Sequence, residues 1–190
     1  SVSFSVEEYK RPKFYVEFDT LSGDFALGES ISVRGFAKAY AGNNIDGATV
    51  KYRVIRRARF PYSWAFYRWG QPSALQQEIA HGTAKTNADG SFTIAFTALP
   101  DKSIDPKTLP VFSYEVSADV TDINGETRSG TQTVQVGYRS MQIVADMPEQ
   151  GFAKDFDTIG IVSQNLNGVF TPATLHLTIQ KLQFPGKISG

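Results

Sequence analysis

Hydrophobic and polar residues alternate along most of the first 137 positions, and clusters of Gly, Asn, Asp and Pro separate the alternating runs. A period of two is typical of strands with one buried and one exposed face. No stretch repeats apolar residues at the spacing of an amphipathic helix over three turns. The pattern predicts seven strands, at residues 13–19, 30–40, 48–56, 76–86, 91–98, 112–120 and 126–136, of which the fourth alternates least regularly.

The residues between these runs favour antiparallel hairpins. Asn124-Gly125 is the pair that type I′ hairpin turns prefer, and Asp46-Gly47 and Asp89-Gly90 separate other runs. We therefore predict an all-β fold, an antiparallel immunoglobulin/fibronectin III-like β-sandwich, over residues 12–137. Tyr114 in the sixth strand should pack in the core and anchor its hydroxyl to the backbone.

The same order of features starts again after Gly137. Residues 30–33 correspond to residues 158–161, 128 positions later, and residues 48–54 correspond to residues 173–179, 125 positions later. Repetition at such an interval predicts tandem sandwich domains.

The two ends of the chain extend this prediction. Residues 138–190 supply about three strands, which are too few to bury both faces of a sandwich. We therefore expect them to be the first strands of a following domain, and residues 1–11 to be the last strand of a preceding domain and a linker. The chain would then be an internal part of a longer array, and its unpaired strands would pair at an edge, or exchange, with a second copy in a dimer.

Several runs carry a family resemblance. Phe4-Ser5-Val6-Glu7-Glu8-Tyr9, followed by Pro12-Lys13-Phe14, resembles the junction between the second and third macroglobulin domains of the alpha-2-macroglobulin and complement family. Gly28-Glu29-Ser30-Ile31-Ser32-Val33 and Thr86-Asn87-Ala88-Asp89-Gly90-Ser91-Phe92 resemble the bacterial branch. The resemblance covers most of residues 1–137 and implies macroglobulin domains, truncated at both ends of the chain.

The resemblance also implies a function. Members of the family trap peptidases: a bait region is cleaved, the molecule rearranges, and a Cys-Gly-Glu-Gln thioester often captures the attacker. This chain has no Cys and hence no thioester, and its matching residues are strand and linker positions. The implied role is a scaffold, whose partners are the neighbouring macroglobulin domains of the same chain and, through the full-length protein, target peptidases. Bacterial members are envelope proteins, so the implied location is periplasmic or extracellular, with a lipid anchor upstream.

Composition excludes several other functions. The 19 basic and 19 acidic residues give a net charge of zero, which argues against nucleic-acid and anionic-membrane binding. No run approaches the length of apolar sequence that membrane insertion needs. The absence of Cys excludes thiolate metal sites and Cys nucleophiles. Neither a Gly-x-Ser-x-Gly motif nor a phosphate loop is present. We expect no enzyme, and no catalytic, cofactor-binding or metal-binding residues.

An aromatic insertion after the third strand is the candidate contact surface. Its residues are Trp64, Phe66, Tyr67 and Trp69, and the basic residues Arg53, Arg56, Arg57 and Arg59 precede it. These aromatics either cover a sheet edge or a neighbouring domain, or they bind single-stranded nucleic acid or carbohydrate. The neutral charge favours packing. The alternative function is a fibronectin-like binding module of a surface adhesin or glycan-processing protein that uses residues 60–69.

Two other groups of residues suggest metal sites only weakly. Asp119, Asp122, Asn124 and Glu126 lack the order of a calcium-binding loop, so a hairpin turn is the better interpretation. His81 and His176 have no second-ligand pattern beside them, and we expect neither to bind metal or act as a general base.

Overall fold

The structure is a computed structural model that describes residues 11–60, 76–146, 158–178 and 180. Within these residues the chain forms nine strands and one short 3-10 helix, and no described helix is long and apolar enough to cross a membrane. The elements are β1 (Phe14–Phe18), β2 (Ser30–Ala39), β3 (Thr49–Arg59), β4 (Gln77–Lys85), β5 (Ser91–Thr97), η2 (Pro106–Thr108), β6 (Val111–Thr121), β7 (Thr127–Gly137), β8 (Met141–Asp146) and β9 (Gly160–Asn165). The seven predicted strands are confirmed as β1 to β7, whereas the strand expected within residues 1–11 falls mostly outside the described residues.

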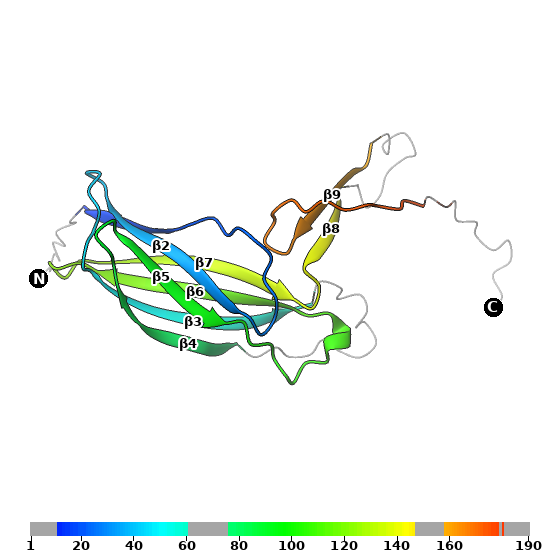
Figure 1. The fold of residues 1–190 in the computed structure, drawn as a ribbon, viewed down its shortest axis with the longest axis horizontal. Helices are drawn as coiled ribbons and strands as arrows, with labels where there is room; N and C mark the ends of the chain where they lie inside the picture. The colour runs from blue at the N-terminus through cyan, green and yellow to red at the C-terminus, as the bar shows by residue number, and fades with distance from the viewer. Residues whose placement is uncertain (1–10, 61–75, 147–157, 179, 181–190) are drawn as a thin grey trace, which may run out of the picture.

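The first seven strands form two sheets that pack as the layers of a sandwich (Figure 1). One sheet has the order β1-β2-β5 and the other has the order β4-β3-β6-β7. All neighbouring strands are antiparallel. Because β4 pairs with β3, the sheets differ from those of immunoglobulin constant domains, where the fourth strand joins the first sheet. The predicted all-β, antiparallel sandwich is confirmed.

The core lies between the two sheets and contains the inward positions of the alternating runs. Its largest fully buried side chains are Tyr114, Phe14, Phe92 and Phe112. As predicted, the Tyr114 hydroxyl donates a hydrogen bond to the backbone, to the carbonyl oxygen of Leu99 at 3.0 Å. Burial raises the pKa of the Tyr114 phenol, which keeps the hydroxyl protonated as a donor.

β3 keeps an unbroken register with β6, whereas its register with β4 shifts between Val54 and Ile55. The extra residue of this β-bulge is Ile79 of β4, so β3 itself keeps its alternation. Arg56, two residues after Val54, therefore lies on the inward face and is only 5% exposed, and Ile55 on the opposite face is buried as well. This corrects the interpretation of Arg56 as part of a ligand-binding basic run: its place in the alternation of β3 directs it into the sandwich.

The buried Arg56 guanidinium is paired on both of its terminal nitrogens. Nη1 donates to the carbonyl oxygens of Leu99 and Pro100 at 3.1 and 2.7 Å, and Nη2 donates to Gln77 Oε1 at 2.7 Å and Asp101 Oδ2 at 2.8 Å. These bonds offset the cost of removing the charge from water. Because residues 99–101 follow β5, the cluster ties the two sheets together at one end of the sandwich.

The turn between β6 and β7 differs from the type I′ turn that we predicted. Gly125 has a φ of 81°, but Asn124 does not have the positive φ that type I′ requires. Gly125 N donates to Asp122 O at 3.1 Å and Asp122 N donates to Glu126 O at 3.0 Å, so the loop is a type I turn followed by a glycine bulge. The Asp122 carboxylate favours this longer loop because it accepts hydrogen bonds from Asn124 N and Glu126 N. The more general prediction of a hairpin turn is confirmed.

β8 and β9 form a separate two-stranded antiparallel sheet. The strand expected at residues 173–179 is not formed in its described part, residues 173–178, which run on from β9 without joining a sheet (Figure 1). In the sandwich, the corresponding strand β3 pairs with β4 and β6 and never with β1 or β2. The described residues after Gly137 contain counterparts of β1 and β2 alone, so a third strand has no ladder to join there.

The buried ion pair gives a prediction on acid stability. Hydrogen bonds from Ser103, and next the charge of Arg56, hold the pKa of Asp101 below its usual value. A carboxyl with a lower pKa in the folded than in the unfolded chain stabilises the fold above about pH 4, and this contribution is lost as the pH falls through the folded value. Asp101→Asn should therefore flatten the dependence of unfolding free energy on pH between 7 and 3, and lower stability at pH 7 by about 1–3 kcal/mol.

Urea unfolding at each pH measures this effect. Asp46→Asn, at an exposed turn position, is the control and should change neither quantity. Parallel pH curves for the Asp101→Asn variant and the unchanged chain would contradict the prediction.

A close approach inside the first sheet gives a second prediction. Gly35 pairs directly with Phe92, and a Cβ at Gly35 would lie 2.4 Å from Phe92 Cζ. The Phe92 ring is buried and packs edge-on against Phe18, with ring centroids 5.7 Å apart, so it has little room to move. Gly35→Ala should lower stability by about 1–3 kcal/mol through overpacking. In a double-mutant cycle followed by thermal unfolding, Phe92→Leu should recover part of that loss, and purely additive losses would refute the explanation.

Candidate functional site

The predicted aromatic contact surface cannot be placed. Trp64, Phe66, Tyr67 and Trp69 all lie outside the described residues. Of the basic residues before them, Arg56 is buried, and Arg57 Nη1 lies 3.0 Å from Glu115 Oε2 on the outer face of the four-stranded sheet. These two guanidinium groups are therefore paired within the sandwich.

The residues considered as metal ligands serve in local contacts. Asp119 Oδ1 accepts a hydrogen bond from the Ser129 hydroxyl, and Glu126 Oε1 accepts one from Lys13 N at 3.0 Å. His81 is exposed, with Nδ1 2.9 Å from Glu78 Oε1, and the exposed His176 follows β9. In the part of the chain that the structure describes, no three His, Asp or Glu side chains are placed to hold a metal ion.

The candidate functional site is the junction between the sandwich and the β8–β9 hairpin. The hairpin lies at the end of the sandwich opposite to the described N-terminal residues (Figure 1). Only residues 138–140 connect the last strand of the sandwich, β7, to β8. Such a short connection limits how far the hairpin can move from the sandwich.

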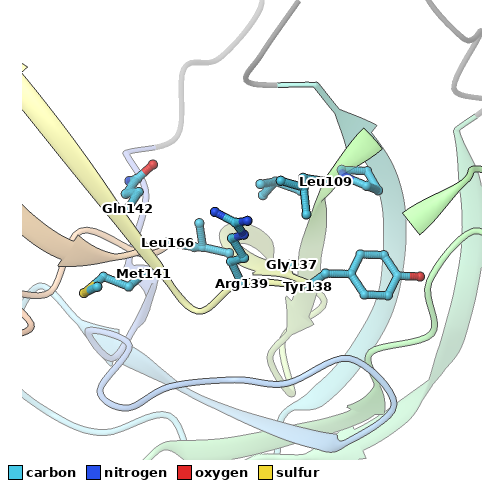
Figure 2. A pocket seen from close by; sticks show the side chains of 9 residues that line it. Leu109, Gly137, Tyr138, Arg139, Met141, Gln142 and Leu166 are labelled. Carbon is cyan, nitrogen blue, oxygen red and sulfur yellow. The ribbon is translucent and has the colours of Figure 1, made fainter. Parts of the chain in front are cut away.

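Leu166, in the turn after β9, is the apolar centre of the junction and is only 8% exposed. It helps to line a recess with Leu109, Pro110 and Val111 near the start of β6 and with the connection after β7 (Figure 2). A Cβ on Gly137 would lie 3.1 Å from Leu166 Cδ1 and 3.3 Å from the carbonyl oxygen of Arg139. The lack of a side chain at Gly137 therefore leaves space for Leu166.

The turn that carries Leu166 is held in one conformation by its own hydrogen bonds. Asn165 N donates to Val169 O at 2.8 Å, Gly168 N donates to Asn165 O at 3.1 Å, and Gly168 has a φ of 84°. The Asn165 side-chain oxygen accepts from Asn167 N at 3.0 Å and from Val169 N at 2.9 Å. A turn stabilised in this way loses little conformational entropy when it docks.

Asn167 joins this turn to the second sheet. Its Oδ1 accepts from Gln135 N at 2.8 Å, and its Nδ2 donates to Gln135 O at 3.0 Å. β7 is the edge strand of its sheet, so Gln135 has backbone groups that no neighbouring strand pairs. The amide of Asn167 therefore pairs with the edge as one residue of an additional strand would.

Asn165 joins the same turn to the segment that leads into the first sheet. Its Nδ2 donates to the carbonyl oxygen of Gly23 at 3.1 Å and to Asp24 Oδ1 at 3.2 Å. Residues 23 and 24 lie between β1 and β2. One turn thus contacts both the edge strand β7 and the segment between β1 and β2, and contacts at two separate places resist rotation as well as separation.

The connection itself packs on the core. The rings of Tyr138 and Phe112 pack edge to face, with centroids 6.4 Å apart. The Arg56 guanidinium lies over the ring of Phe112, 5.9 Å from its centroid. The junction is therefore continuous with the cluster that ties the two sheets together. Its contacts are amides, carbonyls and apolar groups, an arrangement suited to holding two units at a fixed orientation.

No family model and no curated protein sequence matches the chain. Solved structures match it in fold. The chain aligns with native Escherichia coli alpha-2-macroglobulin with a TM-score of 0.55, over 87% of its length and at 8% identity. With methylamine-reacted Salmonella alpha-2-macroglobulin, the TM-score is 0.57 over 86% of the chain at 10% identity. In fold, the chain matches bacterial alpha-2-macroglobulins.

The likeness to alpha-2-macroglobulin extends past the sandwich, because an alignment over 87% of the chain is longer than residues 14–137. The elastase-activated E. coli alpha-2-macroglobulin also matches, with a TM-score of 0.55 over 85% of the chain at 8% identity. The chain spans 11% of the native E. coli protein, 12% of the Salmonella protein and 15% of the elastase-activated E. coli protein. At such identities the likeness is one of fold.

Sequence reasoning missed the junction residues Asn165, Leu166 and Asn167, although a signal was present. Asn165-Leu166-Asn167-Gly168 has the same spacing of turn residues as Asp122-Ile123-Asn124-Gly125. The spacing indicates a glycine-bulge turn in both places. It does not indicate that Leu166 docks on the sandwich, because that contact depends on residues far away in the chain.

Asn167→Ala tests the junction. The variant loses both hydrogen bonds to Gln135, so the hairpin should detach more often, and amides in β8 and β9 should exchange with deuterium about tenfold faster. The matched control is Asn124→Ala, at the same position of the other turn, where the side chain donates to Asp122 Oδ2 within the turn itself. The control should leave β8 and β9 unchanged, and neither variant should alter exchange in the core strand β6. Equal exchange of the hairpin in both variants would contradict the assignment.

Proposed function

We propose that this chain is a scaffold segment of a bacterial alpha-2-macroglobulin-like peptidase trap and takes no part in catalysis. Residues 12–137 would form one complete macroglobulin domain, residues 1–11 the end of the preceding domain, and residues 138–190 the start of the following one. The direct partners would be neighbouring domains of the same chain, and target peptidases would be met through the full-length protein.

The junction is the observation that carries this proposal. Three features hold the hairpin against the sandwich: a three-residue connection, a buried Leu166, and amide hydrogen bonds to β7 and to the segment between β1 and β2. A trap that encloses its target must move its domains as coupled bodies. Domains joined by such contacts transmit a displacement, whereas domains on flexible linkers would absorb it.

The family resemblance and the fold supply the rest of the proposal. Runs such as Gly28-Glu29-Ser30-Ile31-Ser32-Val33 resemble the bacterial branch of the family, and solved structures of bacterial alpha-2-macroglobulins are similar to the chain in fold. On the same grounds we place the full-length protein in the cell envelope, facing the periplasm or the exterior and held by a lipid anchor.

A trapping assay on the natural full-length protein tests the proposal. Porcine elastase is the peptidase to use, since it activates the matched E. coli protein. After incubation, elastase should hydrolyse a large protein substrate more slowly and still cleave a small chromogenic peptide. Combining Leu166→Asp with Asn167→Ala should weaken this protection by loosening the junction, while Asn124→Ala should retain it.

Two results would count against the proposal. Undiminished hydrolysis of the protein substrate would show that the full-length protein traps no peptidase. Binding of a glycan by the 190-residue chain, lost in Trp64→Ala and Trp69→Ala variants with unchanged unfolding temperature, would support the binding-module alternative instead.

A further inference from the structure

The turn after β2 has the same geometry as the docked turn after β9. Ala39 N donates to Asn43 O at 2.8 Å, Gly42 N donates to Ala39 O at 2.9 Å, and Gly42 has a φ of 90°. These bonds and this φ match those of residues 165–169, each at a position 126 residues earlier. The two turns are equivalent parts of a structural repeat.

The strands around the two turns follow the same repeat. An isolated bridge pairs Lys38 with Asn44 after β2, and another pairs Gln164 with Phe170 after β9. β1 pairs with β2 as β8 pairs with β9, both antiparallel. Tyr40 in the turn after β2 is therefore equivalent to Leu166 in the turn after β9.

The registers also relate Tyr15 to a residue of the junction. In the first repeat Phe14 pairs with Ala39, and Tyr15 is the next residue of β1. In the second repeat Met141 pairs with Asn165, and Gln142 is the next residue of β8. Tyr15 is therefore equivalent to Gln142. Gln142 lines the same recess as Leu166. Tyr15 and Tyr40 pack on each other, with ring centroids 5.3 Å apart.

The two equivalent turns, after β2 and after β9, differ in what covers them. Leu166 is 8% exposed because it docks on the end of the sandwich that precedes it in the chain, whereas Tyr40 is 64% exposed. Tyr40 also lies beside the chain that enters its own unit, since its N–H donates to Lys13 O at 3.0 Å. In each copy the turn is thus next to the connection from the preceding unit.

We infer that Tyr40, with Tyr15 beside it, is a docking surface for the strand ends of a preceding β-sandwich. The recess that receives Tyr40 would be formed by residues equivalent to Pro110 and Gly137 of this chain. In a second copy of the chain, Leu166 already packs at the position that Tyr40 would take, so that copy offers no equivalent place for Tyr40. The occupant is therefore a separate sandwich domain that precedes this one.

The chemistry of the contact follows from the residues of the first turn. Ala39 and Ala41 stand at the positions of Asn165 and Asn167, so the turn lacks the amides that pair with the backbone in the second copy. Two tyrosine rings supply a large apolar area with polar tips instead. The inference rests on the tandem arrangement in the proposed function and is independent of peptidase trapping.

Hydrogen–deuterium exchange on the natural full-length protein and on the 190-residue chain tests the inference. Amides of residues 39–43 should exchange about tenfold more slowly in the full-length protein, where the preceding domain covers them. Tyr40→Ser should remove this protection and also speed exchange at the strand ends of the preceding sandwich, whereas Tyr40→Phe should retain it. Thermal unfolding of the 190-residue chain should be nearly unchanged by Tyr40→Ser, because the side chain is largely exposed there.

Leu99→Ser is the matched control, since Leu99 is a 49% exposed apolar residue close to Arg56 at the opposite end of the sandwich. It should leave exchange at residues 39–43 unchanged. Equal exchange of this turn in the two proteins, persistent protection in the Tyr40→Ser variant, or a natural protein without a β-sandwich before Ser1 would each overturn the inference. Protection in a protein that traps no peptidase would uphold the contact and refute only the proposed function.

Discussion

The relation between the sandwich and the hairpin depends on the pairing of Asn167 with the backbone of Gln135. An edge strand has N–H and C=O groups without partners, and these groups accept any segment of matching geometry. Here a single side-chain amide supplies both a donor and an acceptor, at 3.0 and 2.8 Å. Hydrogen bonds are directional, so this pair fixes the orientation of the hairpin relative to β7. The burial of Leu166 beside it is not directional and mainly keeps the hairpin close to the sandwich.

The pairing is effective only because the end of the sandwich is itself well ordered. Tyr138 packs on Phe112, Phe112 packs under Arg56, and Arg56 is bonded to the segment that follows β5. The junction thus rests on a surface whose two layers are already joined. The cost of burying a guanidinium is offset by four hydrogen bonds, one of them to the Asp101 carboxylate.

Most of the fold could be predicted from local sequence patterns. Alternation predicted β1 to β7 within a few residues, and Tyr114 was correctly expected to bond the backbone, because both depend on the period of a strand and its place in a sandwich. Arg56 has the same parity as Val50 and Val54, but its burial was not predicted, since the groups that pair its charge, from Leu99 to Asp101, are far away in the chain. Alignment of residues 30–33 with 158–161 implied a repeat of 128, whereas the turns repeat at 126. A difference of two keeps every residue on the same face of its strand, whereas the offset of 125 that aligned residues 48–54 with 173–179 reverses the faces, and no strand forms over residues 173–178.

The site was harder to predict than the fold. The predicted contact surface, Trp64, Phe66, Tyr67 and Trp69, lies outside the described residues. Leu166 is an unremarkable residue between two asparagines, and its role depends on Gly137 lacking a side chain across the recess. Contacts of this kind join parts of the chain that no local pattern relates.

The alanines at positions 39 and 41 have a mechanical consequence. Methyl groups cannot make the directional bonds that Asn165 and Asn167 make in the second turn. An aromatic contact resists being pulled apart but lets its partners swivel, whereas an amide clasp resists torsion as well. In a tandem array of sandwiches, the connection at Tyr40 would therefore be easier to rotate than the junction at Asn165 and Asn167. Under an applied load the array would bend first at the tyrosine contact.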